Sequence, residues 1–502
     1  MENFKLQSFS IEPRLSAESI DFGNHGCEEE FAEAECHQPK PCHCGKGIFC
    51  QFSSSGVPSE TAQSTADAQQ KNPFSMDPKS GAALLQEYLD GVQPNKRYQF
   101  LASLMRKQWK WFCRAAPYFT FPEPKPLREG EPIRIAFRTF NMTAGGIARI
   151  IQTLANHFAD GKNYHISILV DESWMDRIDY KVHPNVELIP VKKNSTWENI
   201  FTEHPQDLVV CPQSGSVENF QMAFLLKFLG IRVLMQEHGG PYPHFLFNSH
   251  RERLAHLAPL YGVCDAVSCL TTVEVDRWRK KNVANSIYLP NPPTFRVEDV
   301  EPAALDSQTV LWVGRWEPVA KRPQLAIEAF AKILEKVPSA RLVMLGTNTG
   351  QRYCATYERC VERIRELGIG HAVEICGFQC DLPPHYSSGA LLMNTSLFEG
   401  FPMAIFEAKT FGLPVVTMAM PYVEVMKRGG CIQVPQGDVD ALANAAIDLL
   451  LNGEKRKKLG AEARNDVEEN FSYAAILGKY EALFDAIFKG KEAVRKLCAR
   501  AA

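Results

Sequence analysis

The chain has 502 residues, of which 45% are apolar and 23% charged, a composition typical of globular proteins with two or three domains. Its formal net charge of −3 provides no positive field, so we expect no nucleic-acid partner. The fifteen cysteines are scattered and odd in number, which argues against a complete disulfide framework and favours the reducing cytoplasm.

Residues 1–80 are predicted to form a disordered, cysteine-rich extension. Segment 51–80 is rich in Ser, Gln, Ala and Pro, which bury too little apolar surface to fold. The stretch "CHQPKPCHCGKGIFC" offers thiols and imidazoles, the ligands that zinc prefers. They belong to Cys36, His37, Cys42, His43, Cys44 and Cys50. The usual two-residue spacing between ligands is absent, so a zinc site and a reduced, unstructured segment both remain open.

Residues 81–130 are predicted to be helical, with a basic amphipathic helix at 97–116. One side carries Leu101, Leu104, Met105, Trp111 and Phe112, and the other carries Arg106, Lys107, Lys110 and Arg114. Such a helix can lie on an anionic membrane surface, which would make the protein peripheral at the inner face of the cell membrane. The alternative is that its apolar side packs on the folded core. The N-terminal sequence has no signal-peptide pattern, and we expect a cytoplasmic protein without a membrane span.

Residues 131–293 and 294–472 each repeat a pattern of apolar strand, turn and helix. The candidate strands of the first series are "IRIAF", "HISILV", "DLVVC", "VLMQ" and "AVSCL". Those of the second series are "TVLWVG", "ARLVMLG", "AVEICGF", "ALLMNTS", "LPVVTM" and "CIQVP". The repeated alternation predicts an α/β protein with two doubly wound domains, whose ligands bind beyond the carboxyl ends of the strands.

Two carboxylates and two cations are expected at these strand ends. Glu399 and Glu407 lie in "SLFEGFPMAIFEAKTFGLPVV", where a strand exit becomes a helix near Pro402. Arg315 follows another strand and Lys321 begins the next helix, so both should reach the same crevice. Cations can neutralise a diphosphate, and a carboxylate can accept both hydrogens of a ribose diol. The set therefore suits a nucleotide diphosphate sugar.

The region from Ile133 to Ile487 resembles the retaining glycosyltransferases of the GT-B fold, family 4. The resemblance is strongest in "VGRWEPVAKRPQLAIEAF", "VEICGF", "TSLFEGFPMAIFEAKTFGLPVV" and "GDVDALANAA". It implies two facing Rossmann-like domains with a cleft between them. Residues 131–293 would form the acceptor domain, residues 294–472 the nucleotide-sugar domain, and residues 473–502 a helix that crosses back to the first domain.

The resemblance also implies residue roles. Arg315 and Lys321 would hold the donor diphosphate, Glu399 hydroxyls of the donor sugar, and Glu407 the ribose; His238 would contact the donor sugar. Other implied donor-binding positions are Gly145, Gly146, Gly314, Gly377, Phe378, Gly400, Phe401 and Pro402. The loop from Arg315 to Lys321 is one residue longer than the family pattern and contains Trp316.

The first domain supplies two weaker matches. The stretch "TAGGIARI" resembles the family's glycine turn near the phosphates and acceptor, without the proline that often precedes it. Glycines there also simply permit a tight strand-to-helix turn. The stretch "LMQEHGG" ends a strand with His238, which matches a family histidine but can equally be structural.

The implied activity is transfer of a hexosyl unit, with retention, from a UDP- or GDP-sugar to a glycan, lipid-linked or small acceptor. No metal or other cofactor is expected, because Arg315 and Lys321 can stabilise the charge that grows on the diphosphate. Asp438 and Asp440 in "GDVDAL" are interpreted as part of a helix N-terminus rather than a metal site. An epimerase or hydrolase on the same fold, and a non-catalytic sugar-nucleotide-binding scaffold, are the alternatives.

Overall fold

The computed structural model describes residues 72–92, 94–143, 145–161, 163–193, 195–213, 217–239, 257–347 and 351–500. The candidate zinc ligands between Cys36 and Cys50 lie outside the described residues. Residues Pro73–Ala502 form one compact unit. Within it we call the part built on strands β1–β7 the N half and the part built on β8–β13 the C half.

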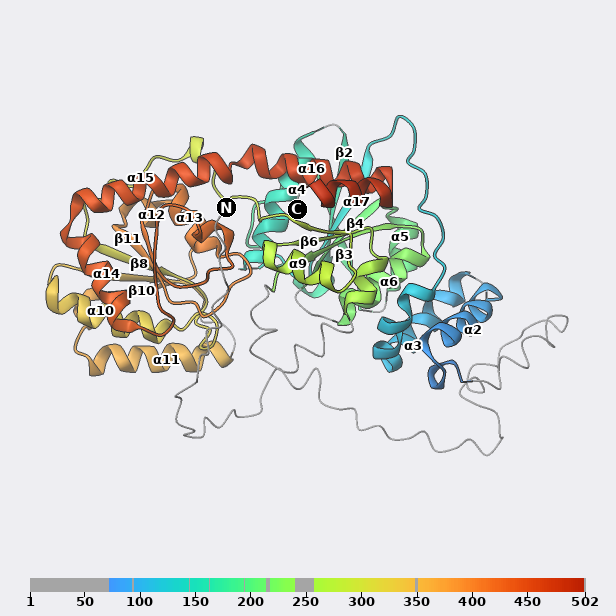
Figure 1. The fold of residues 1–502 in the computed structure, drawn as a ribbon, viewed down its shortest axis with the longest axis horizontal. Helices are drawn as coiled ribbons and strands as arrows, with labels where there is room; N and C mark the ends of the chain where they lie inside the picture. The colour runs from blue at the N-terminus through green and yellow to red at the C-terminus, as the bar shows by residue number, and fades with distance from the viewer. Residues whose placement is uncertain are drawn as a thin grey trace, which may run out of the picture. The chain divides into compact units, whose positions relative to one another are not determined.

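The N half contains a seven-stranded parallel sheet in the order β3-β2-β1-β4-β5-β6-β7 (Figure 1). Its strands are β1 (Ile133–Arg138), β2 (Tyr164–Asp171), β3 (Val186–Val191), β4 (Leu208–Gln213), β5 (Arg232–Glu237), β6 (Ala266–Cys269) and β7 (Ser286–Tyr288). Its helices are α4 (Gly146–Asp160), α5 (Trp197–Glu203), α6 (Val217–Phe228) and α9 (Thr272–Lys280). The strand order reverses direction between β1 and β4.

The C half contains a six-stranded parallel sheet in the order β10-β9-β8-β11-β12-β13. Its strands are β8 (Thr309–Val313), β9 (Arg341–Leu345), β10 (Val373–Gly377), β11 (Leu391–Asn394), β12 (Val415–Met418) and β13 (Cys431–Val434). Its helices are α10 (Pro323–Lys336), α11 (Gln351–Glu366), α12 (Pro383–Ser388), α13 (Met403–Thr410), α14 (Val439–Leu451) and α15 (Gly453–Asn470). Here the order reverses between β8 and β11. Short 3-10 helices lie at Pro73–Ser75, Ala116–Tyr118, Glu172–Trp174, Val297–Asp299, Gly370–Ala372 and Glu424–Met426.

Every strand expected from the sequence is present, and the prediction of an α/β fold with two parallel sheets is confirmed. Strand β12 is buried along its whole length, which explains why it appears in the sequence as the largely apolar run "LPVVTM". Strands β3 and β7 were not predicted, and both lie at an edge of their sheet. Strand β3 contains Pro190, which edge strands tolerate, and β7 has only three residues.

Two C-terminal helices, α16 (Tyr473–Lys489) and α17 (Lys491–Arg500), leave the C half and contact the N half (Figure 1). Ser472 begins this segment, since its hydroxyl accepts a hydrogen bond from the backbone N–H of Ala475. The Gln236 side chain donates to the Tyr480 hydroxyl at 3.2 Å, and Arg279 donates to the Cys498 carbonyl at 2.7 Å. The last helices therefore complete the packing of the N half.

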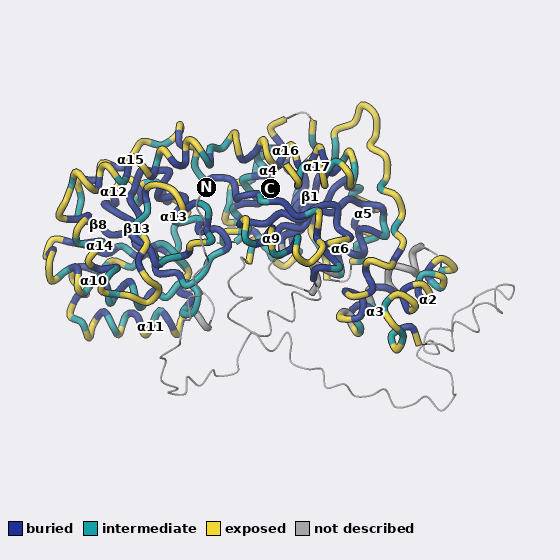
Figure 2. The backbone as a smooth tube through the Cα atoms, in the orientation of Figure 1, coloured by how far each residue is buried: buried dark blue, intermediate teal, exposed yellow. Residues whose placement is uncertain are grey.

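The helices α2 (Pro78–Asp90) and α3 (Pro94–Ala115) precede the N half, and the apolar side of α3 is buried (Figure 2). Phe112 of α3 lies 5.8 Å from Phe224 of α6, ring centre to ring centre. By contrast, Lys107, Lys110 and Arg114 are exposed. The buried side comprises Leu101, Leu104, Met105, Trp111 and Phe112. The apolar side chains that a lipid surface would need are therefore enclosed by protein, as the packed-helix alternative predicts. None of the described helices has the length and apolar character that a membrane crossing needs.

Candidate functional site

Each sheet has a point where its strand order reverses, and the crevice beyond the strand ends at such a point is the usual ligand site of a doubly wound fold. In the N half this point lies between β1 and β4, and in the C half between β8 and β11. Arg315 and Lys321 follow β8, and Glu399 follows β11. The glycine turn at Gly145–Gly146 follows β1. The strongest candidates from the sequence thus lie beside the reversal point of the C half, and the weaker glycine match lies beside that of the N half.

Of the four residues expected in one crevice, Lys321 and Glu399 form an ion pair, whereas Glu407 pairs with Arg149. The side chains of Lys321 and Glu399 are 18% and 12% exposed, so the pair is partly desolvated. The Ser396 hydroxyl donates to the same Glu399 oxygen at 2.6 Å. The loop before Lys321 is fixed to the β11 exit, since the Thr395 hydroxyl donates to the Lys321 carbonyl at 2.7 Å. A cation and a hydroxyl-accepting carboxylate are therefore held side by side.

Arg315 is exposed and lies 5.9 Å from the ring centre of Tyr353. Among the described residues it makes no ion pair with the other candidates. Trp316, which lies in this longer loop, is fully buried, and its ring centre lies 5.6 Å from that of Trp312 and 5.2 Å from that of Tyr357. The longer loop is thus anchored by an aromatic cluster, while Arg315 and Lys321 stay outside that cluster.

Glycines keep the adjacent ends of β8, β9 and β10 close together. The Gly314 N–H donates to the Leu345 carbonyl at 2.9 Å, and the Gly346 N–H donates to the Gly377 carbonyl at 2.8 Å. A Cβ on Gly346 would lie 1.7 Å from the Gly314 oxygen, so only glycine fits there. Gly377 has a φ of +68°, which also favours glycine. Gly346 was not predicted from the sequence as a site residue, although it directly follows strand β9. Phe378, next to Gly377, is half-buried.

Helix α13 begins at Met403 with Pro402 at its N-cap position, close to the predicted start. Gly400, Phe401 and Pro402 are buried, and Phe401 packs 5.3 Å from Phe406. No side chain caps the helix, and the first N–H groups of any α-helix lack acceptors within the helix. These amides can therefore donate to a ligand oxygen.

Glu407 is buried, and protein donors already occupy its carboxylate. Arg149 and the Thr294 hydroxyl donate to Oε1 at 2.8 and 2.7 Å, and the Tyr386 hydroxyl donates to Oε2 at 2.8 Å. Burial disfavours the charged form of Arg149, but the Glu407 carboxylate and the Tyr180 hydroxyl outweigh it, and the pKa of the guanidinium is raised. Burial, together with Glu407, also raises the pKa of Tyr386 well above its usual value.

The sequence did not reveal these three partners, because none of them is close to Glu407 in the chain. Arg149 lies on the first turn of α4, three residues after Gly146. Thr294 lies in the segment between β7 and β8, and Tyr386 in α12. The apolar residues on the same helix face predict that Glu407 is buried. A buried carboxylate needs hydrogen-bond donors, so the sequence indicates that partners exist but not which residues they are.

The two candidate sites predicted in the N half, the glycine turn and His238, lie in different surroundings. Gly145 begins the turn into α4, where its N–H donates to the Tyr180 hydroxyl at 3.1 Å and the hydroxyl donates back to its carbonyl at 3.2 Å. Gly146 has open space where a side chain would stand. His238 follows β5, and burial lowers the pKa of its imidazole to about 4. Its Nε2 has no hydrogen-bond partner among the described residues. A neutral imidazole with a free nitrogen can bind a ligand hydroxyl.

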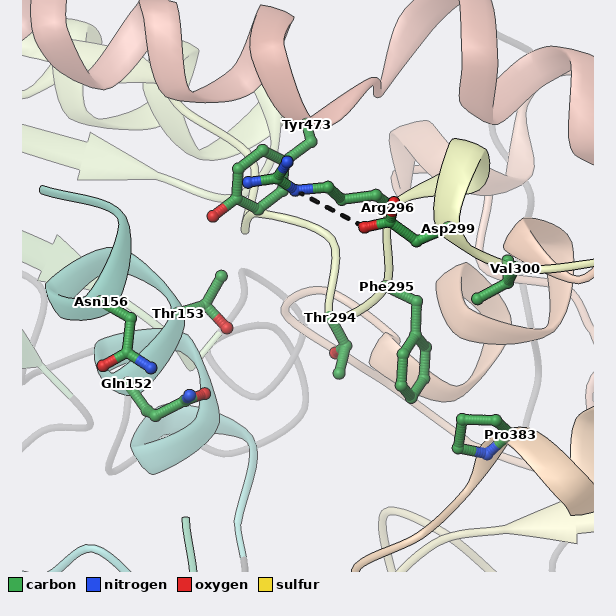
Figure 3. A pocket seen from close by; sticks show the side chains of 10 residues that line it. All are labelled: Gln152, Thr153, Asn156, Thr294, Phe295, Arg296, Asp299, Val300, Pro383 and Tyr473. Atoms are coloured by element: carbon green, nitrogen blue, oxygen red, sulfur yellow. Dashed lines mark ion pairs between the residues drawn. The ribbon is translucent and has the colours of Figure 1, made fainter. Parts of the chain in front are cut away.

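A hollow of about 430 Å³ lies between helix α4 and the segments that join the two halves (Figure 3). Figure 3 shows Gln152, Thr153 and Asn156 on one wall, opposite Thr294 and Phe295. The guanidinium of Arg296 lies 4.2 Å from the ring centre of Tyr473. Asp299, Val300 and Pro383 complete the lining. None of the candidate donor-binding residues lines this hollow.

Imidazole, thiolate and carboxylate side chains are the usual metal ligands in proteins. Within the described ranges, no three His, Cys, Asp or Glu residues stand close enough together to hold a metal ion. The prediction that Asp438 caps a helix is confirmed, because its carboxylate accepts from the Ala441 N–H at 2.8 Å at the start of α14. Asp440 instead pairs with Lys332 at 2.7 Å.

Solved structures share this arrangement of two parallel-sheet halves. Sucrose-phosphate synthase from Thermosynechococcus elongatus aligns with a TM-score of 0.59 and 18% identity over 71% of this chain and 99% of that one. Anabaena HepE in complex with UDP-glucose aligns with a TM-score of 0.58 and 15% identity over 70% of this chain and 99% of that one. The fold is the GT-B fold of glycosyltransferases. Within it, residues 307–452 match the family described as Glycosyl transferases group 1, so the C half carries a domain of that family.

Curated relatives agree with this domain assignment. An uncharacterized glycosyltransferase of Haemophilus influenzae is 23% identical over 373 residues, which cover 70% of this chain and 99% of that protein. The N-acetyl-alpha-D-glucosaminyl L-malate synthase of Bacillus anthracis is 29% identical over 33% of this chain and 42% of its own length. The D-inositol 3-phosphate glycosyltransferase of Corynebacterium diphtheriae is 30% identical over 36% of this chain and 43% of its own. The chain thus matches less than half of the last two. Together the comparisons support a glycosyltransferase activity that uses a nucleotide-sugar donor.

Proposed function

We propose that the protein is a retaining glycosyltransferase of the family 4 type, which moves a hexosyl unit from a UDP- or GDP-sugar to a glycan, lipid-linked or small acceptor. The observation that carries the proposal is the Lys321–Glu399 pair at the strand reversal of the C half. In this proposal Lys321 binds the donor diphosphate and Glu399, beside it, accepts hydrogen bonds from the sugar hydroxyls.

In this proposal the protein stabilises charge rather than supplying a nucleophile. The bond from the anomeric carbon to the diphosphate breaks as the acceptor oxygen bonds to the same face of that carbon. The leaving phosphate takes the acceptor proton. Lys321 and Arg315 would stabilise the negative charge that grows on the diphosphate, and Ser396 would keep Glu399 oriented toward the sugar. Lys321 and Arg315 take the electrostatic role that a metal ion has in other transferases.

Donor binding tests the site directly. We expect UDP or GDP, and the matching sugar nucleotide, to raise the melting temperature of the wild-type protein. Lys321→Ala should weaken nucleoside diphosphate binding by about 1.5–3 kcal/mol, the typical value of a hydrogen bond to a charged group. Lys332→Ala, which removes a surface lysine of the same domain, is the matched control and should bind normally. Equal binding by both variants would exclude Lys321 from the site.

Glu399→Gln tests recognition of the donor sugar separately from recognition of the nucleotide. Because Glu399 is assigned to sugar hydroxyls, this variant should bind the sugar nucleotide more weakly and the nucleoside diphosphate almost normally. Incubation with a labelled donor, with and without candidate acceptors, then distinguishes the alternatives. A labelled acceptor indicates a transferase, and free labelled sugar or an epimerised donor indicates the hydrolase or epimerase. Binding without any turnover indicates the scaffold.

A further inference from the structure

The Glu407 carboxylate is the point at which three separate parts of the chain meet. Arg149 approaches from helix α4 of the N half, Thr294 from the segment that joins the halves, and Tyr386 from α12 of the C half. The side chains of Arg149 and Glu407 are 13% and 4% exposed. One buried carboxylate therefore ties the N half to the C half.

The hydrogen-bonding capacity of this carboxylate limits what else it can hold. Each carboxylate oxygen has about two lone-pair sites. On Oε1 both sites are used, by Arg149 at 2.8 Å and by Thr294 at 2.7 Å, whereas Tyr386 is the one donor to Oε2 among the described residues. A diol that donates one hydrogen to each oxygen needs a free site on both. It therefore cannot bind until Arg149 or Thr294 lets go of Oε1.

We propose that Arg149 and Thr294 compete with the ribose diol of the donor for Glu407, so that donor binding opens this contact between the halves. The inference rests on the proposed function and on the ribose-binding role that the family resemblance implies for Glu407. Arg149 and Thr294 then act as positioning residues. Their hydrogen bonds hold the Glu407 carboxylate in place when the site is empty, and they break when a nucleotide with both ribose hydroxyls binds.

Thr294→Val is the first test, because it frees one site on Oε1 without removing a charge or changing the side-chain volume much. We expect the variant to bind UDP, or GDP if that is the nucleotide of the wild-type protein, about tenfold more tightly than wild type. Thr153→Val is the control, since Thr153 lines the same hollow as Thr294 and makes no hydrogen bond to Glu407. It should bind as wild type does.

The diol requirement separates competition from a merely structural effect. The gain of Thr294→Val should vanish with the 2′,3′-dideoxy nucleoside diphosphate, which cannot donate to Glu407. Arg149→Lys keeps the charge and should bind the ribonucleotide with an affinity between those of wild type and Thr294→Val. An equal or lower affinity of Thr294→Val for the ribonucleotide would overturn the proposal, and so would an equal gain with the dideoxy nucleotide.

The outcome for wild type distinguishes this inference from the function on which it rests. If the wild-type protein binds no nucleoside diphosphate, that result contradicts both the proposed function and the proposed competition for Glu407. Wild-type protein that binds the ribonucleotide and the dideoxy nucleotide equally leaves the transferase proposal intact. That result would instead remove Glu407 from the ribose site and overturn the competition alone.

Discussion

Arg149→Gln should destabilise the protein strongly, because it leaves the Glu407 carboxylate buried without its cation. Removing one partner of a buried ion pair typically costs about 3–5 kcal/mol. Thr294 and Tyr386 remain as neutral donors, so we expect a loss near the lower end of that range. Urea denaturation followed by circular dichroism measures the change in the free energy of unfolding.

A double-mutant cycle isolates the pair from other effects of the substitution. In Arg149→Gln combined with Glu407→Gln no charge is left buried, so the double variant should recover a large part of the loss. Arg363→Gln is the matched control, since Arg363 pairs with Glu328 at the surface, and its effect should be far smaller. Additive losses in the double variant, or an Arg149 effect no larger than that of Arg363, would refute the reasoning.

The remaining predictions concern the N-terminal helices, metals and pH. Trp111→Ala should lower the free energy of unfolding by about 3–5 kcal/mol because the ring is buried, and calorimetry would detect it. Replacing Lys107, Lys110 and Arg114 with Gln should leave stability nearly unchanged, as thermal melts would show, since these side chains are exposed. Transfer should persist in EDTA; complete loss that Mg²⁺ or Mn²⁺ restores would contradict the metal-free proposal. His238, whose pKa is about 4 in the fold and about 6.5 when unfolded, binds a proton more readily in the unfolded chain, so stability should fall as pH drops from 6.5 to 4. His238→Gln should flatten that part of the stability profile, and an unchanged profile would show that this ring is not the cause.

The fold was largely predictable because parallel strands buried on both faces leave a strong local signal. Short apolar runs such as "VLM" within β5 (Arg232–Glu237) mark a strand without any knowledge of its neighbours. The edge strands β3 and β7 lack this signal, since one contains Pro190 and the other is only three residues long. Their pairing depends on the strand beside them rather than on their own composition.

The sequence predicted those contacts of the candidate site that follow from the ends of neighbouring strands. It did not predict contacts between residues that are far apart along the chain. Lys321 and Glu399 follow adjacent strands, so their meeting follows from topology. The partners of Glu407 could not be predicted, because 258 residues separate Arg149 from it along the chain.

The path of α16 and α17 has a consequence for biosynthesis. The ring of Phe484 lies 5.1 Å from Phe158 and 6.5 Å from Tyr164, so the C-terminal helices cover apolar groups of α4 and β2. Phe158 and Tyr164 emerge from the ribosome more than three hundred residues before the helix that covers them. Until residues 473–500 have been made, the nascent N half exposes this surface, which is the kind of surface that chaperones recognise and that promotes aggregation. Shortening the chain before Tyr473 would therefore uncover a hydrophobic face rather than remove a dispensable tail.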